Sequence, residues 1–285
     1  MKRLVKNLMP YGLYCFLQGK QNVQAGAYKF IIDTDCRLTG WMEPAHVKIE
    51  LDPKEYIPQQ IIKNGMYEKA NIKKLYELLP QNGIFFDIGA NIGIYSLNLC
   101  RKAEHVFAFE ATKTTYDKLS KTVKNNEIKN IQLYLNAVDD KDDAEVEIFE
   151  TLSEDNTYDI GRNSMHSGNV LANTVKTITL DTFVEQNNIS KIDVIKIDIE
   201  GNELYALKGC MKSIKKYRPV ILCEVSSELN IAAGYEPKEL CNFFAKNLKY
   251  EAKILLNDRF YKIPMWMLKT LKMWRYSTSI FFFPL

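Results

Sequence analysis

Two glycines and an acidic residue, set between an apolar run and a helical pattern, carry the first chemical signal in the sequence. The stretch FFDIGANIGIYSL (85–97) spaces Asp87, Gly89 and Gly93 as Asp-x-Gly-x-x-x-Gly. Gly89 would let the backbone approach a ligand, Gly93 would tolerate close strand–helix contact, and the amides at the helix start would favour a ligand carboxylate. Glycines also punctuate ordinary turns, so the motif alone is equally compatible with a simple reversal of the chain.

A second acid in register with the first changes this interpretation. The strand-like run VFAFE ends at Glu110, 23 residues after Asp87, and an acid in that position commonly binds the two hydroxyls of a ribose. The glycine spacing differs from G-x-G-x-x-G, and Asp87 would repel a pyrophosphate but suit an ammonium group. A ligand with an amino-acid end and a ribose end is S-adenosylmethionine, whereas NAD and an oxidoreductase are disfavoured.

The run KIDIEG (196–201) supplies candidates for methyl transfer to a hydroxyl group. On a strand, Lys196 and Asp198 would face the same side, with Asp198 at the carboxyl end above the crevice. A hydroxyl acceptor needs a base, which Asp198 could provide while Lys196 helps to hold it ionised. Glu200, at the following turn, could bind the acceptor or cap the next helix. A buried ion pair of Lys196 and Asp198 without a catalytic role is the alternative.

Four further residues are candidates for the acceptor side of such a site. Glu224 ends the apolar run PVILCE, and the polar loop 151–173 carries Arg162, Asn163 and His166. His166 is an alternative base, although an isolated exposed histidine usually has no catalytic role. The six cysteines form no metal-like spacing with the three histidines, so we assign no metal, while the converging acids leave a divalent cation open.

The elements that must position these residues alternate along the chain. Strand-like apolar runs cover 83–89, 105–110, 131–138, 193–198, 219–225, 250–256 and 279–284, and helical patterns cover 93–102, 114–127, 181–188, 201–214 and 237–247. This alternation predicts an α/β fold, with a mostly parallel sheet covered by helices on both faces. Shorter strands at 145–150 and 175–180 flank the polar loop, and the last two runs fit a closing antiparallel hairpin.

The chain divides into a preface and a main domain. Residues 1–62 form a basic extension with short strands at 28–33 and 47–51. Residues 63–285 form the main domain, which includes the loop 151–173 and an aromatic, basic segment at 257–277. The preface and this segment are the parts whose role the motifs leave open.

Charge is unevenly distributed along the sequence. Residues 1–32 and 259–285 each contain five Lys or Arg and no acid, which leaves 28 basic and 35 acidic residues between them. The acidic body argues against nucleic-acid binding, whereas the basic ends permit contact with phosphate or an anionic membrane surface. No run of about 18 apolar residues predicts a spanning helix. We expect a cytoplasmic protein with unpaired cysteines, and peripheral membrane contact and a homodimer as options.

The sequence resembles the FkbM-type methyltransferases of the class I S-adenosylmethionine-dependent superfamily. The resemblance covers about residues 65–256 and rests on FFDIGANIGIYSL, FAFEA, NAVDD, ITLDTF, IDVIKIDIEGNELYALKG and RPVILCEV, in the family's order and spacing. It implies a Rossmann-like, seven-stranded sheet and methyl transfer from S-adenosylmethionine to a hydroxyl of a small molecule, best a sugar or nucleotide-sugar. A non-sugar acceptor, and a binding module that keeps the fold without turnover, are the alternatives.

The resemblance also implies roles for the residues at matching positions. The methionine part of the cofactor would be held by Asp87, Gly89, Ala90, Asn91 and Gly93. Glu110 would bind the ribose, and Asn136 and Ala137 would lie near the adenine. Glu68, which precedes the first strand of the main domain, would approach the methionine part.

Overall fold

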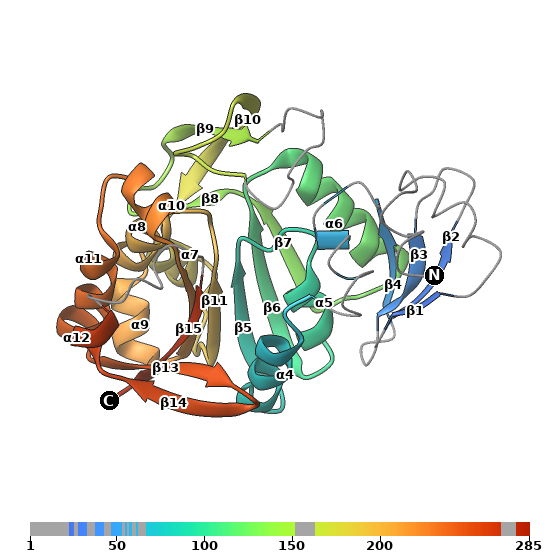
Figure 1. Cartoon of the computed structure of the whole chain (residues 1–285). Coiled ribbons are helices and arrows are strands. Elements are labelled where there is room, and N and C mark those ends of the chain that lie inside the picture. The colour runs from blue at the N-terminus through green and yellow to red at the C-terminus, as the bar shows by residue number, and fades with distance from the viewer. Residues whose placement is uncertain are drawn as a thin grey trace, which may run out of the picture.

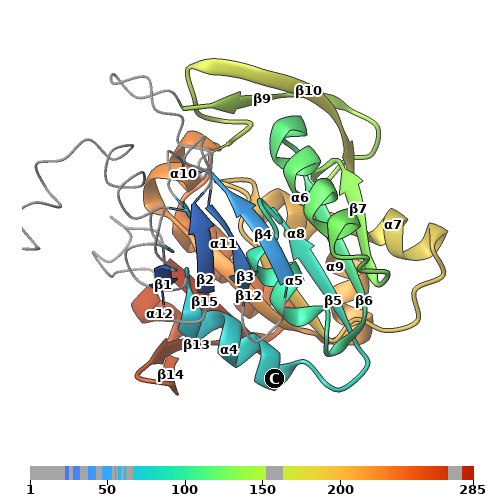
Figure 2. The same ribbon diagram turned by 90° about the vertical axis from the view of Figure 1, so that its right-hand side faces the viewer.

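A sheet of eight strands forms the centre of the molecule, in the order β14-β13-β15-β12-β11-β5-β6-β7 (Figure 1). The computed structural model describes residues 67–151, 163–268 and 278–285, together with 23–25, 28–32, 38–42, 47–52, 55, 57, 58 and 61. The strands of the sheet are β5 (Gly83–Ile88), β6 (Ala103–Glu110), β7 (Ile131–Leu135), β11 (Val194–Ile197), β12 (Val220–Val225), β13 (Tyr250–Leu256), β14 (Arg259–Ile263) and β15 (Thr278–Pro284). Helices lie on both faces, as the alternating pattern predicts (Figures 1 and 2).

The five strands from β7 to β12 are parallel to one another. Every residue of β5 and of β11 is buried, because strands covered by helices on two faces have no polar side. Two apolar clusters flank this sheet: one includes Phe86 and Phe183, and another includes Phe85 and Leu119. The strand order reverses between β5 and β11, so their carboxyl ends frame the crevice in which such folds bind ligands.

The seven predicted strands of the sheet are present, and β14 adds an eighth at the edge. β13 and β15 pair in antiparallel orientation, as predicted. β14 lies in the segment 257–277, where the sequence predicts no strand, and an edge strand that exposes most of its side chains has no apolar run to reveal it. Asn257 and Asp258 join β13 to β14 with φ angles of 49° and 61°, as two-residue hairpin turns require.

One predicted helix is divided in two. The helices are α4 (Lys69–Leu78), α5 (Ile94–Leu99), α6 (Lys113–Asn125), α7 (Leu180–Gln186), α8 (Glu203–Lys208), α9 (Met211–Tyr217), α10 (Ser227–Ala232), α11 (Pro237–Asn242), the π-helix η1 (Phe243–Leu248) and α12 (Met265–Leu268). The predicted helix 201–214 is wrong as a single element, because α9 begins separately. The carboxylate of Asp181 accepts hydrogen bonds from the amides of Lys212 and Ser213, at 2.9 and 2.7 Å, and satisfies the first turn of α9.

A smaller sheet beside β7 consists of β8 (Ala137–Val138), β10 (Val170–Ile178) and β9 (Glu145–Glu150), in that order. The predicted strand 131–138 is therefore wrong at its end: Ala137 and Val138 pair with β10 instead of extending β7. The predicted loop 151–173 is shorter than expected, because residues 170–173 already belong to β10 and pair with β9. Residues 152–162 of that loop lie outside the described residues.

The N-terminal strands form a four-stranded antiparallel sheet of β1 (Val23–Ala25), β2 (Tyr28–Ile32), β3 (Leu38–Met42) and β4 (Val47–Leu51). The two strands predicted in this region correspond to β2 and β4. β4 packs on α6, since Ile49 and Leu119 share one apolar cluster and the side chain of Asn126 exchanges two hydrogen bonds of 2.7 Å with the backbone of Lys48. The domain boundary placed at residue 62 lies outside the described residues, and none of the described helices is long and apolar enough to cross a bilayer.

Candidate active site

The turn after β5 is shaped by contact with the end of β11. Gly89 has a φ of +77°, and the amides of Gly89 and Ala90 donate to the carbonyl of Phe109 at 3.0 and 2.9 Å. A Cβ on Gly89 would lie 1.8 Å from the carbonyl oxygen of Asp198. Glycine is therefore required here because two strand ends meet, and not only because a ligand approaches the backbone, as its sequence context predicts.

Asp87 lies beneath this turn. Its carboxylate is fully buried and accepts hydrogen bonds from the amide and the hydroxyl of Ser96, at 3.0 and 2.6 Å, so it fixes the first turn of α5. Burial raises the pKa of Asp87, and the charge of Lys196 opposes that rise. Gly93 follows the turn and has a φ of +86°. A Cβ at this position would come within 2.3 Å of Leu119, so the close packing of the turn against Leu119 requires glycine.

Glu110 closes the other side of the turn and lines the pocket. One of its carboxylate oxygens accepts the amide of Asn91 and the other accepts the amide of Thr112, both at 2.8 Å. Burial raises the pKa of Glu110, and these two hydrogen bonds oppose the rise. Each oxygen keeps a second lone pair, so the carboxylate can still accept the hydroxyls of a ribose.

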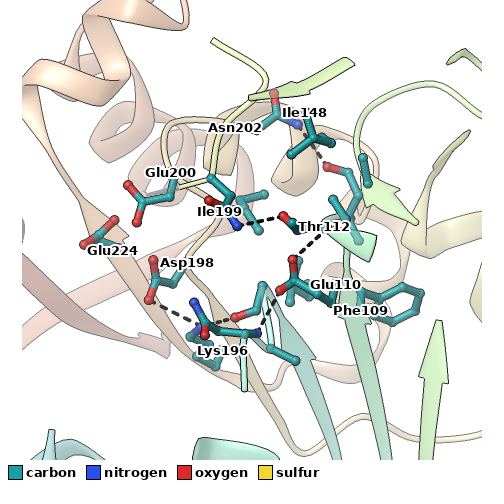
Figure 3. Close-up of a pocket in the computed structure, with 18 of the residues that line it drawn as sticks. Phe109, Glu110, Thr112, Ile148, Lys196, Asp198, Ile199, Glu200, Asn202 and Glu224 are labelled. Atoms are coloured by element: carbon teal, nitrogen blue, oxygen red, sulfur yellow. Dashed lines mark hydrogen bonds and ion pairs between the residues drawn. The ribbon is translucent and has the colours of Figure 1, made fainter. Parts of the chain in front are cut away.

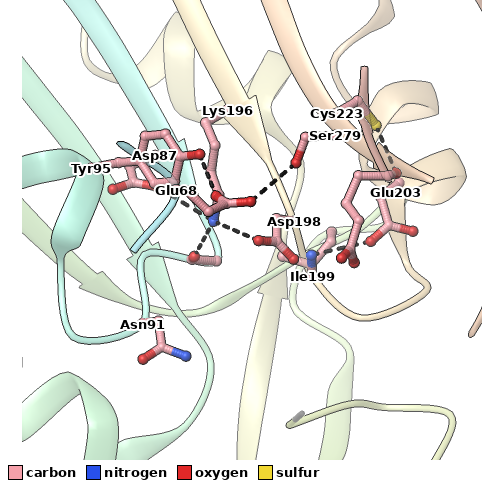
Figure 4. Close-up of polar contacts among 12 residues, drawn as sticks. Glu68, Asp87, Asn91, Tyr95, Lys196, Asp198, Ile199, Glu203, Cys223 and Ser279 are labelled. Carbon is pink, nitrogen blue, oxygen red and sulfur yellow. Dashed lines mark hydrogen bonds and ion pairs between the residues drawn. The ribbon is translucent and has the colours of Figure 1, made fainter. Parts of the chain in front are cut away.

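Lys196 joins the turn to the end of β11 (Figure 4). Its Nζ donates to the carbonyl of Gly89 at 2.6 Å and lies 3.4 Å from a carboxylate oxygen of Asp198 and 3.8 Å from one of Asp87. Burial disfavours the charged amine, but the surrounding carboxylates, that of Asp198 foremost, outweigh this and raise the pKa of Lys196. The side chain is thus a fixed cation and cannot serve as a base near neutral pH.

Three carboxylates converge at one end of the pocket (Figure 3). Asp198, Glu200 and Glu224 each present one oxygen within 4.8 Å of the others. They follow β11, or end β12, at the carboxyl edge of the sheet, where the sequence analysis expected them. This spacing suits several hydroxyls of an acceptor and would also suit a divalent cation.

The other end of the pocket combines apolar walls with amide groups. Phe109 and Ile148 form part of the wall (Figure 3). Asn136 donates to the carbonyl of Lys176 at 3.1 Å, and Asn163 donates to the hydroxyl of Thr112 at 3.0 Å. A flat, mostly apolar ring with a polar edge fits such a surface, as the assignment of Asn136 and Ala137 to adenine requires.

Most of the residues singled out in the sequence share this one pocket. Its wall includes Gly89, Ala90, Asn91, Glu110, Asn136, Ala137, Asn163, Lys196, Asp198, Glu200 and Glu224. Asp87 and Gly93 lie below it, as described above. Their proposed contacts with a cofactor are therefore through the turn that they hold.

Two candidates are not on the described wall of the pocket. The carboxylate of Glu68 accepts hydrogen bonds from the hydroxyls of Tyr95 and Ser279. Burial and the nearby charge of Asp198 raise its pKa, and its contact with the methionine part stays a prediction. His166 lines a second groove, where its Nε2 lies 3.0 Å from the amide oxygen of Asn202, so the structure does not bring it to Asp198. Arg162 is outside the described residues.

The pocket also includes residues that the sequence analysis did not assign. They are Ile57, Tyr67, Tyr95, Thr112, Met165 and Asn202, among others. Thr112 and Asn202 each lie two positions after an acidic site residue, in the turn that follows a strand, and that position could have indicated them. Ile57 and Tyr67 come from chain that lies before the motifs, and no local pattern marks them.

The pocket lies at the point where the strand order reverses, which is where folds of this kind bind their ligands. The fold and the site together define a class I S-adenosylmethionine-dependent methyltransferase. Residues 87–252 match the Methyltransferase FkbM domain, which is more than half of the chain, so this protein belongs to the FkbM methyltransferase family and uses S-adenosylmethionine.

Two relatives of known class are similar in sequence. Hexuronic acid methyltransferase AglP of Haloferax volcanii is 28% identical over 180 residues, which cover 63% of this chain and 68% of AglP. Methyltransferase sdnD of Sordaria araneosa is 26% identical over 183 residues, which cover 54% of this chain and 68% of that protein.

Two solved structures show a weaker similarity to this chain. The FkbM methyltransferase of Methylobacillus flagellatus has 14% identity and a TM-score of 0.46, over 79% of this chain and 60% of its own. A Streptococcus mutans protein in complex with SAH has 13% identity and a TM-score of 0.44, over 76% of this chain and 97% of its own.

Proposed function

We propose that this protein methylates a hydroxyl of a sugar or nucleotide-sugar, with Asp198 as the general base. The observation that carries the proposal is the position of Asp198, on the pocket wall at the end of β11 and 3.4 Å from the fixed cation of Lys196. The name of the Haloferax volcanii relative, which acts on a hexuronic acid, supports a sugar-like acceptor.

The residues of the pocket have different roles in such a reaction. The cofactor, when bound, supplies an electrophilic methyl group, and the turn from Gly89 to Asn91 together with Glu110 would hold it. Asp198 takes the proton of the acceptor hydroxyl, while Lys196 stays charged and balances the carboxylate. Glu200 and Glu224 hydrogen-bond neighbouring hydroxyls and align the acceptor, which supplies much of the rate in a reaction of this kind.

Calorimetry and an acceptor screen test this function. S-adenosylhomocysteine should bind the wild-type protein and NAD should not; absence of S-adenosylhomocysteine binding would overturn the proposal. Transfer of labelled methyl groups is then measured with methyl glycosides of neutral sugars, uronic acids and amino sugars. We propose that no metal takes part, because Lys196 already supplies a positive charge, so rates should be equal in EDTA and in Mg²⁺.

The variant Asp198→Asn should lose about 10²–10⁴-fold in kcat, the range that a general base contributes. Its affinity for S-adenosylhomocysteine should change little. Asp193→Asn is the matched control, since Asp193 precedes the same strand and its carboxylate accepts the amide of Ile84 at 2.7 Å and pairs with Lys191 at 3.9 Å, at the end of the strand opposite to Asp198. Full activity of Asp198→Asn would assign the base to another residue.

The remaining expectations concern the surroundings of the protein. The four described cysteines, Cys100, Cys210, Cys223 and Cys241, are buried and form no disulfide bond, which supports the proposal of a reducing, cytoplasmic compartment. Membrane contact through the basic ends and a homodimer stay predictions. Residues 1–22 and 269–277, which hold most of that charge, lie outside the described residues.

A further inference from the structure

Glu203 is a buried carboxylate for which the proposed chemistry has no direct use. It is the first residue of α8 and is 1% exposed. One of its oxygens accepts hydrogen bonds from the amides of Ile199 and Gly201, each at 3.1 Å, and Figure 4 draws the first of these contacts. Both amides belong to the turn that follows β11 and carries Asp198.

This turn has a backbone that needs outside support. Glu200 has a φ of +52° and Gly201 a φ of +110°, and residues with side chains rarely adopt positive φ angles unless their surroundings impose them. A Cβ on Gly201 would lie 2.7 Å from the carbonyl oxygen of Leu229, so the turn also packs tightly against α10. The conformation that points Glu200 into the pocket is therefore held from below.

The other oxygen of Glu203 belongs to a buried network. It lies 3.2 Å from the side-chain nitrogen of Asn230 and 3.2 Å from the hydroxyl of Tyr235. The Tyr235 hydroxyl in turn lies 2.9 Å from the carbonyl oxygen of Gly201 and 2.7 Å from Asn230. The amide and the carbonyl of Gly201 are thus both held by buried side chains, an arrangement that fixes a single geometry.

We propose that Glu203 is a positioning residue for methyl transfer, which sets the place of Asp198 and Glu200 in the pocket. The amide of Asp198 donates to the carbonyl of Ile88 at 3.1 Å, and Glu203 holds the amide of the next residue. The proposed base is therefore fixed on both sides, once by the sheet and once by Glu203. This inference rests on the proposed function of Asp198.

The variant Glu203→Gln tests the role with almost no change in volume. Its amide oxygen accepts the two backbone amides more weakly than a carboxylate does, and its NH₂ group replaces the oxygen that Asn230 and Tyr235 contact. We expect kcat to fall about 10–100-fold, as a displacement of about 1 Å can cause. The Kd for S-adenosylhomocysteine should stay within about threefold, because the turn after β5 is untouched.

Two further variants separate positioning from stability. Asp181→Asn is the matched control, because Asp181 also accepts two backbone amides but lies away from the pocket; it should lower the melting temperature and leave kcat unchanged. Tyr235→Phe removes only the hydroxyl, and should lower kcat in the same direction as Glu203→Gln. Tyr235→Phe provides the test if the Glu203→Gln variant fails to fold.

A double-mutant cycle provides the decisive comparison. If Glu203 acts through Asp198, Glu203→Gln should add little to the loss already caused by Asp198→Asn. Multiplicative losses, or a kcat within twofold of wild type for Glu203→Gln and Tyr235→Phe, would overturn the proposal.

Hydrogen exchange supplies a measure that needs no acceptor. The amides of Ile199 and Gly201 should exchange about tenfold faster or more in Glu203→Gln, while those of β5 keep the wild-type rate. Unchanged exchange of these two amides would also overturn the proposal. A wild-type protein that does not bind S-adenosylhomocysteine counts against the proposed function instead, so the two failures are distinguishable.

Discussion

At the scale of single residues, the positive charge of Lys196 allows several carboxylates to lie close together in and below the pocket. It is 4% exposed, and carboxylate oxygens of Asp87 and Asp198 lie within 4 Å of its ammonium group. A buried carboxylate without a partner is costly, so a cation at this point allows acids to face both the cofactor turn and the acceptor. The same ammonium group holds the carbonyl of Gly89, which couples charge to the shape of the turn.

Replacing Lys196 by Met should therefore destabilise the protein strongly. We expect a loss of about 3–5 kcal/mol in the free energy of unfolding, the cost of leaving a buried charge without its partner, and weaker binding of S-adenosylhomocysteine. Urea denaturation and calorimetry measure the two effects. Lys191→Met is the control, because Lys191 also donates to a backbone carbonyl, that of Asn82, but its side chain is 45% exposed. A loss of stability no larger than the control's would contradict this account.

At the scale of elements, the parallel strands could be predicted from the sequence. Each of them is a short apolar run, which can be recognised without knowing the strand that it pairs with. β5, β6, β11 and β12 are of this kind. β8 and β14 were not distinguished, because one continues an apolar run but pairs with another sheet, and the other exposes most of its side chains. The turn between β5 and α5 also depends on tertiary contact. The end of β11 lies so close to Gly89 that no other residue fits at that position.

Two alanine substitutions separate the conformation of a glycine from its contacts. Gly89→Ala combines a φ of +77° with a Cβ 1.8 Å from a carbonyl oxygen, whereas Gly234→Ala has a φ of +85° and no atom closer than 4.0 Å. Gly234→Ala should cost about 1–2 kcal/mol, the strain of a left-handed backbone alone. Gly89→Ala should cost more and abolish binding of S-adenosylhomocysteine. Equal stability of the two variants, or retained binding by Gly89→Ala, would show that the contact is not decisive.

At the scale of the whole molecule, buried acids govern the dependence of stability on pH. Burial raises the pKa of Asp87, Glu110 and Glu203 above the ordinary values of 3.8 and 4.5. The folded protein therefore binds more protons than the unfolded chain just above these values, and stability is lost as the pH rises through this window. Glu251 is different, because its ion pairs with Lys262 and Lys253 at the surface lower its pKa. The contribution of these pairs to stability is lost only as the pH falls below about 4.5.

The free energy of unfolding should accordingly fall as the pH rises above about 4.5, by up to about 1.4 kcal/mol per pH unit for each titrating group. Chemical denaturation at a series of pH values measures the slope. Glu203→Gln cannot titrate at this position, so its slope should be smaller even if its stability is lower throughout. An identical slope in the variant would exclude Glu203 as one of the groups responsible.

The chemistry of the site could largely be predicted from the sequence. The proposed cofactor residues lie at the ends of strands, and these strands can be recognised from local apolar runs. Asp87, Glu110 and Asp198 could be found in this way, and so could the α/β order of the main domain. Their individual positions could not. Asp87 was expected to face the ligand and lies beneath the turn, and His166 lines a different groove because it is held by Asn202.

By itself, then, the sequence determined the family, the cofactor and the strand ends that carry the site, since a parallel sheet brings the carboxyl ends of its strands to one edge. Only the tertiary structure decided which of those residues reach the pocket, why Gly89 must be glycine, and that Glu203 lies under the turn of Asp198. The first two depend on contacts between segments far apart in the chain, such as Gly89 and Asp198, and the third also depends on Asn230 and Tyr235. Contacts of this kind have no signature in a local pattern.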